Sequence, residues 1–96
     1  MQSTQKALGQ FSTPKASGYL QQLCKHFAHK IPVTFEETSG EISFPIATCT
    51  LAASDDELQI TVTATTLEDL ERAKAIIDSH LERFAFREGF KTMYWS

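Results

Sequence analysis

The sequence predicts an α+β fold in which an antiparallel sheet carries two helices on one face. Two observations lead to this class. Apolar residues recur every three or four positions in two segments, and they alternate with polar residues in the segments around these two. The length of 96 residues, with 42% apolar and 22% charged residues, is typical of one folded unit around one core. We therefore expect residues 1–96 to form a single domain.

The first helix is predicted between Thr13 and Pro32. Thr13 is a residue type that caps helices, Pro14 suits the first helical position, and Pro32 ends the helix because its ring removes a hydrogen-bond donor. The second helix is predicted to follow Thr66, with Asp69 three residues on as a shortened capping box. The apolar stripes are Ala16, Leu20, Leu23, Cys24, Phe27 and Ile31 in the first helix, and Leu67, Leu70, Ala73, Ile77, Leu81 and Phe84 in the second.

Six strands are predicted around these helices. One precedes the first helix, four lie between the helices, and one follows Gly89, which closes the second helix. The strands are Ala7–Ser12, the segments containing Val33 with Phe35, Ile42 with Phe44, and Cys49 with Leu51, then Leu58–Ala64 and Phe90–Trp95. The order is β-α-β-β-β-β-α-β, a two-layer sandwich.

The segment around Pro45 leaves two topologies open. A two-residue turn at Ile46 and Ala47 makes two separate strands, so that the sheet is a four-strand meander between antiparallel helices. A bulge within one long strand instead makes the helices parallel. We favour the turn. The strand pairs that it predicts are Phe44 with Cys49 and Ile42 with Leu51.

Charge and hydropathy exclude several classes of partner. The net charge of -3 argues against a general nucleic-acid or anionic-membrane surface, because such a surface needs many lysine and arginine side chains that face phosphate groups. The chain contains no apolar run of about 18 residues, and its first ten residues lack the apolar run of a signal peptide. We expect a cytoplasmic location, in which Cys24 and Cys49 are reduced thiols.

The three histidines are the candidate metal ligands. His26 and His29 are neighbours at i, i+3 on the first helix, so they form half of a plausible transition-metal site, and His80 is the third candidate. Cys24 points to the core side of the helix and is expected to pack there. With antiparallel helices we expect His26 and His80 to be about 10 to 15 Å apart along the helix axes, too far to share a metal. Parallel helices would place His26 and His80 at the same position along the helix axes. The three-histidine site therefore depends on whether a turn or a bulge follows Pro45.

The basic residues near these histidines have two interpretations. Lysines and histidines in the last turns of a helix oppose its dipole, and Arg83 and Arg87 form an ordinary solvated helix face. Alternatively, Lys25, Lys30, Arg83 and Arg87 recognise an anionic ligand, because arginine suits carboxylate and phosphate groups. Phe86 lies off the apolar stripe and is either helix-end packing or an exposed contact for a partner.

Three segments carry a resemblance to a known family. LCKHFAHKIPV, EETSGEI and HLERFAFRE resemble the bacterial domain of unknown function 2218 family, and the resemblance runs from about Ser12 to Trp95. The family has no established activity. A similar domain occurs fused to siderophore-interacting flavoproteins, which reduce ferric siderophores. The resemblance therefore implies a role near iron acquisition, with a siderophore-related flavoprotein as a protein partner.

Three functions are compatible with the sequence. We favour a non-enzymatic accessory domain that binds a ligand, a transition metal or a protein partner. The alternatives are a protein–protein interaction module without a small ligand, and a small enzyme that uses His26 or His80. We assign no catalytic residue, because the chain lacks a glycine-rich phosphate loop, a G-x-S-x-G elbow and a paired-cysteine metal motif.

Overall fold

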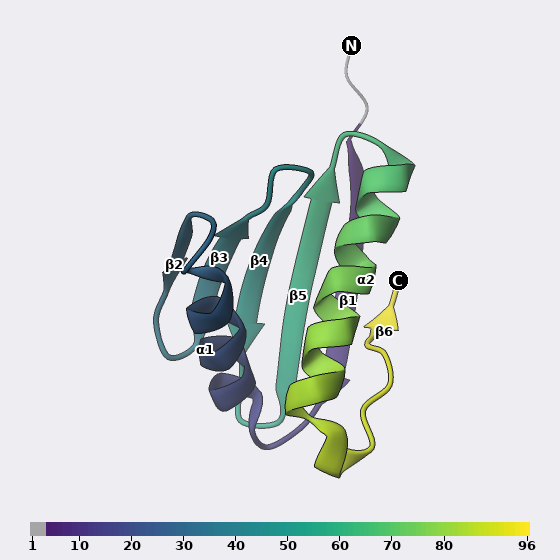
Figure 1. Cartoon of the computed structure of the whole chain (residues 1–96). Coiled ribbons are helices and arrows are strands. Elements are labelled where there is room, and N and C mark those ends of the chain that lie inside the picture. The colour runs from purple at the N-terminus through teal and green to yellow at the C-terminus, as the bar shows by residue number, and fades with distance from the viewer. Residues whose placement is uncertain (1–3) are drawn as a thin grey trace.

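The computed structural model describes residues 4–96 and confirms the predicted α+β class and the order of its elements (Figure 1). The elements are β1 (Gln5–Ser12), α1 (Ala16–Phe27), β2 (Val33–Phe35), β3 (Ser39–Ser43), β4 (Thr48–Ala53), β5 (Glu57–Ala64), α2 (Leu67–Phe84), the 3-10 turn η1 (Phe86–Glu88) and β6 (Tyr94–Trp95). Within residues 4–96, neither helix is both long and apolar enough to cross a membrane.

The sheet has the strand order β2-β3-β4-β5-β1-β6, and all its neighbouring strands are antiparallel. The N-terminal strand β1 therefore lies inside the sheet, between β5 and the short C-terminal strand β6. Both helices cover the same face. In Figure 1, α1 crosses the half of the sheet formed by β2, β3 and β4, and α2 runs over β5 and β1. Because β1 and β5 are antiparallel and each is followed by a helix that turns back over the sheet, the two helices are antiparallel.

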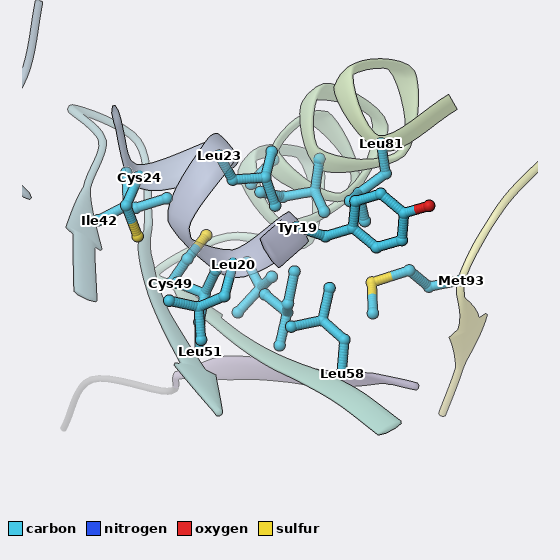
Figure 2. Close-up of a cluster of buried hydrophobic side chains, with 14 of the residues drawn as sticks. Tyr19, Leu20, Leu23, Cys24, Ile42, Cys49, Leu51, Leu58, Leu81 and Met93 are labelled. Atoms are coloured by element: carbon cyan, nitrogen blue, oxygen red, sulfur yellow. The ribbon is translucent and has the colours of Figure 1, made fainter. Parts of the chain in front are cut away.

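The core lies between the helices and the covered face of the sheet. Every second residue of β5 is buried, as the alternation predicts, and the predicted stripes of both helices point into the same layer. The exception is Leu67, the first residue of α2, which is predicted to be in the core but is 60% exposed. Figure 2 shows this cluster. Its largest fully buried side chains are Leu20, Leu23, Ile42, Leu51, Leu58, Ile60, Ile77 and Leu81. The opposite face is polar and solvated, with threonines at positions 34, 48, 50, 61 and 63.

The turn between β3 and β4 is present, but the predicted register is wrong. The amide of Phe44 donates to the carbonyl of Ala47 at 2.8 Å, so Pro45 and Ile46 are the two central residues of the turn. Proline has the backbone angle that the first central position of a turn needs, which explains the shift. The observed pairs are Ile42 with Cys49 and Gly40 with Leu51. Because the shift is two residues, the same side chains stay on the core face.

The predicted first helix is also too long at both ends. The helix begins at Ala16, and Thr13 lies before it, where its hydroxyl accepts a hydrogen bond from the Lys15 amide at 3.1 Å. At the other end, Phe27 is the last helical residue, and the amides of Lys30 and Ile31 bond to its carbonyl in a following turn. At the start of α2, Thr66 caps the helix as predicted, because it accepts a hydrogen bond from the Asp69 amide at 3.1 Å. The helix ends at Phe84, and Gly89, which is predicted to close it, instead closes η1 with a φ of 74°.

The C-terminal segment is bound to α2 by one carboxylate, and its strand is shorter than predicted. Asp78 accepts hydrogen bonds from the Thr92 hydroxyl at 2.7 Å, the Met93 amide at 2.9 Å and the Trp95 indole N–H at 2.9 Å. The Met93 amide is bonded to Asp78 and not to β1, so the strand begins at Tyr94. Its pairing with β1 continues to Ser96, whose amide and carbonyl both bond to Leu8. A Cβ on Gly9 would lie 2.8 Å from the Trp95 ring, so glycine is what allows the ring to approach β1 this closely.

We predict that Asp78→Ala releases this segment. Loss of three hydrogen bonds to a charged acceptor is expected to lower the free energy of unfolding by about 2 to 4 kcal/mol. Because Trp95 is the only tryptophan, its fluorescence should shift to longer wavelength in the folded variant. Glu82→Ala, at an exposed position of the same helix, is the matched control. An unshifted Trp95 spectrum in Asp78→Ala would show that the strand is held without the carboxylate.

Candidate functional site

A groove with an apolar floor and basic side chains at its margin lies where the C-terminal end of α1 meets α2 and the β3–β4 turn. Its volume is about 340 Å³. Phe27 is central to it, with its ring centroid 5.0 Å from that of Phe44 and 4.8 Å from that of His80. The residues that line the groove are His26, Phe27, Lys30, Ile31, Phe44, Ile76 and His80.

The groove brings His26 and His80 together, which corrects the predicted separation of these residues. Their ring centroids are 4.8 Å apart, with an angle of 54° between the ring planes. The prediction treated convergence as a sign of parallel helices, yet the helices are antiparallel and the histidines still meet. The error was to assume that the two helices begin level with opposite ends of the sheet. In fact, α2 has 18 residues and α1 only 12, so their positions in the sheet do not determine which residues of the two helices lie side by side. A contact between the two segments determines this alignment.

That contact is the carboxylate of Glu88, just beyond the end of α2. Thr13 donates its hydroxyl hydrogen to Glu88 at 2.8 Å, and the Tyr19 hydroxyl also donates to it. Figure 2 shows the Tyr19 ring beside Leu81, with its hydroxyl directed away from the aliphatic side chains. About two helical turns separate Tyr19 from His26, and a similar length of chain separates Glu88 from His80. Antiparallel helices that are joined at Tyr19 and Glu88 therefore bring the two histidines level.

The imidazole of His80 is held in one orientation. Its Nδ1 lies 2.7 Å from the carbonyl oxygen of Ile76, one turn earlier in α2. A carbonyl oxygen can only accept, so Nδ1 carries the proton and donates. In neutral His80, the lone pair is consequently on Nε2. This nitrogen can accept a proton from a ligand or coordinate a metal.

The groove has a basic environment although the chain as a whole is acidic. Desolvation by neighbouring side chains lowers the pKa of His26 below its usual 6.5, and positive charges lower it further. The charged groups that act on it are all basic: His80, Lys30, Arg83 and His29. None of the seven lining residues is acidic.

The structure separates the predicted basic residues into two groups. Lys30 lines the groove, and Arg83 is near enough to act on His26. Lys25 and His29 are exposed and do not line it. Arg87 is in η1, where its guanidinium carbon lies 5.6 Å from the ring centroid of Phe86. The four predicted anion-binding residues therefore do not all belong to this groove.

The histidines and cysteines do not form a cluster of three or more metal ligands. Over residues 4–96, no group of three or more histidine, cysteine, aspartate or glutamate side chains is placed to hold a metal ion. Cys24 and Cys49 are free thiols, as predicted, and both are buried. Burial raises the pKa of Cys24 to about 11 and that of Cys49 to about 12, which is characteristic of packing residues rather than nucleophiles.

Sequence reasoning missed the apolar floor of the groove. The sequence places Phe27 in the core stripe of the first helix and Phe44 in a strand, and it links neither residue to a ligand site. A signal was present for Ile76, which lies four residues before His80 on the same face of α2. No comparable signal links Phe44 to His26, because they come from different elements and meet only in the folded chain.

We predict that the contribution of Glu88 to stability depends on pH. The hydrogen bond from Tyr19 is the main cause that lowers the pKa of Glu88 below its usual 4.5. A carboxylate with a lowered pKa stabilises the folded state above pH 4.5, and this stabilisation is lost as the pH falls through the folded-state pKa. In urea titrations, Glu88→Gln should therefore be less stable than the wild type at pH 7, with a deficit that shrinks toward pH 3. Glu82→Gln is the control, and a deficit that stays constant with pH would contradict this role.

The pKa of His26 should also be measurably low. We expect an NMR titration to place the pKa of His26 below 6.5, and His80→Ala should raise it, because the substitution removes both covering atoms and the neighbouring imidazole that lowers it. Lys25→Gln, which alters an exposed lysine of α1 outside the groove, should have a smaller effect. A His26 pKa that stays unchanged in His80→Ala would mean that the two rings are not in contact in solution.

Comparison with known proteins yields one family and one solved structure. The structure is an NMR structure of PA4090 from Pseudomonas aeruginosa, which has 26% sequence identity and a TM-score of 0.79 and covers 95% of this chain and 94% of its own. No curated protein matches the chain. Residues 9–96 match the model of DUF2218, described as an uncharacterized protein conserved in bacteria. With nearly the whole described chain matched, this protein belongs to the bacterial DUF2218 family.

Proposed function

We propose that this chain is a small accessory binding domain that takes up a flat, apolar anion such as an aromatic carboxylate, with the groove between His26 and His80 as its site. The observation that carries the proposal is an apolar floor within an entirely basic margin. A groove of about 340 Å³ lies in the size range of small-molecule sites, which are mostly apolar with a few polar groups.

The shape of the groove favours a planar ligand. The rings of Phe27 and Phe44 are nearly perpendicular, at 78°, so a ligand ring can lie against the face of one and the edge of the other. Ile31 and Ile76 complete an apolar wall. The transfer of an aliphatic or aromatic group from water to this wall is the main favourable contribution to binding at such a surface.

The charges favour an anionic group on that ligand. Lys30 and Arg83 place two positive charges near the rim, and the imidazole of His26 can offer an N–H donor, whereas the Nδ1–H of His80 is bonded to the Ile76 carbonyl. A carboxylate or a phosphate accepts hydrogen bonds from such groups, and charge-assisted bonds are stronger than neutral ones. The resemblance implies a link with iron or siderophore handling, and an aromatic ligand with acidic oxygens is compatible with that context.

A protein partner is the second candidate, favoured by one exposed aromatic residue. Phe86 is 63% exposed at η1, and the adjacent Arg87 lies over its ring. Exposed aromatic residues beside arginine are common at protein interfaces. The partner that the resemblance implies is a siderophore-related flavoprotein, and in that case the chain is an interaction module. Cytoplasmic location and the small-enzyme alternative stay predictions.

An NMR titration with 1-naphthoate tests the proposed ligand class. We expect shifts confined to residues of the groove and a dissociation constant of about 1 mM, from roughly 0.3 kcal/mol per non-hydrogen atom. Lys30→Gln should weaken binding about fivefold, because it removes one charge-assisted hydrogen bond worth roughly 1 kcal/mol. Lys25→Gln should leave the affinity unchanged.

The neutral analogue 1-naphthamide supplies the control for charge. It should bind several-fold more weakly than the carboxylate. Equal binding of the two compounds would refute an anion site, and shifts centred on Phe86 instead of Phe27 would favour the second candidate.

A further inference from the structure

The strongest feature beyond the anion site is the arrangement of two imidazoles from different helices. His26 projects from the last turn of α1 and His80 from the second half of α2, and both line the open groove. Over residues 4–96, no hydrogen bond occupies Nε2 of His80 or either ring nitrogen of His26. Nitrogen lone pairs are therefore free on both rings at a solvent-accessible position.

We propose that His26 and His80 form a two-histidine site for a divalent transition metal at the mouth of the groove. An imidazole nitrogen binds such an ion at about 2.0 to 2.1 Å, which places the ring centroid about 3.2 Å from the metal. Two imidazoles at 90° to 109° around one ion then have centroids about 4.5 to 5.2 Å apart. The observed separation of 4.8 Å lies within this interval.

The hydrogen bond of His80 provides a second, independent observation. Metal-binding histidines usually donate their other ring N–H to a carbonyl or a carboxylate, which fixes the orientation of the ring. His80 does so through Nδ1 to the Ile76 carbonyl at 2.7 Å. Its coordinating nitrogen is consequently Nε2, and little side-chain freedom is left to lose on metal binding.

The surroundings select the class of metal. Imidazole ligands suit Cu²⁺, Ni²⁺ and Zn²⁺, and Cu²⁺ binds most strongly of the three. Lys30 and Arg83 repel every divalent cation alike, so the order of affinities is set by the imidazole ligands. Two protein ligands leave coordination positions open for water or for an exogenous anion. This inference does not depend on the proposed carboxylate site, although one ligand could occupy both.

The experiment uses the full chain after treatment with EDTA. Calorimetric titration with Cu²⁺ should give one site per chain, and His26→Ala and His80→Ala should each weaken it at least tenfold. His29→Ala is the matched control, because it removes an exposed imidazole of the same segment that lies outside the groove. NMR with Zn²⁺ should shift the ring resonances of His26 and His80 together. NMR fingerprint spectra verify that each variant is folded.

Two results would overturn the proposal. If His29→Ala weakens binding as much as His26→Ala while His80→Ala does not, the metal is held by neighbours on α1 alone. If all three variants bind like the wild type, the histidines are not ligands.

Lys30→Gln separates this proposal from the anion site, because the predicted effects have opposite signs. Loss of the positive charge should tighten Cu²⁺ binding about twofold to fivefold and weaken 1-naphthoate binding. Failure of the naphthoate titration with retained Cu²⁺ binding would reject only the proposed function, and the reverse outcome would reject only the metal site.

Discussion

The position of α1 along α2 is set at the carboxylate of Glu88. Thr13 and Tyr19, on either side of the start of α1, both donate hydrogen bonds to it. With this junction fixed, His26 lies beside His80, and the groove has both imidazoles at its margin.

The groove exists because the helical layer is incomplete at one end of the sheet. The last helical residue of α1 is Phe27, and the chain then turns toward β2 at Pro32, so the end of β3 beyond Ile42 is not covered by a full helix. Phe44 is consequently only partly buried, and its ring contacts Phe27 from the side. The end of α1 at Phe27 therefore limits the core and also leaves apolar surface accessible to a ligand.

The distribution of charge gives that surface its chemical character. The chain has twelve acidic and nine basic side chains, but the groups that surround His26 are basic. Acidic residues gather elsewhere, at the β2–β3 turn with Glu36 and Glu37 and at the β4–β5 turn with Asp55 and Asp56. A net charge of -3 for the whole chain is therefore compatible with a locally positive groove, because salt screens electrostatic interactions over about 10 Å.

The amino-acid sequence alone predicts the type and order of the helices and strands, the buried side of most of them and the thiol character of both cysteines, but not the ends of α1 or the extent of β6. These properties depend on local periodicity and on residues such as Thr66 and Pro45, which act within a few positions of themselves. The β3–β4 register was wrong by two residues because the alternation of period two is unchanged by such a shift. The contact between His26 and His80, by contrast, is a property of the folded chain that local patterns do not predict. That contact depends on the overlap of two helices of unequal length, which is set by the hydrogen bonds between Glu88 and residues about 70 positions earlier in the chain.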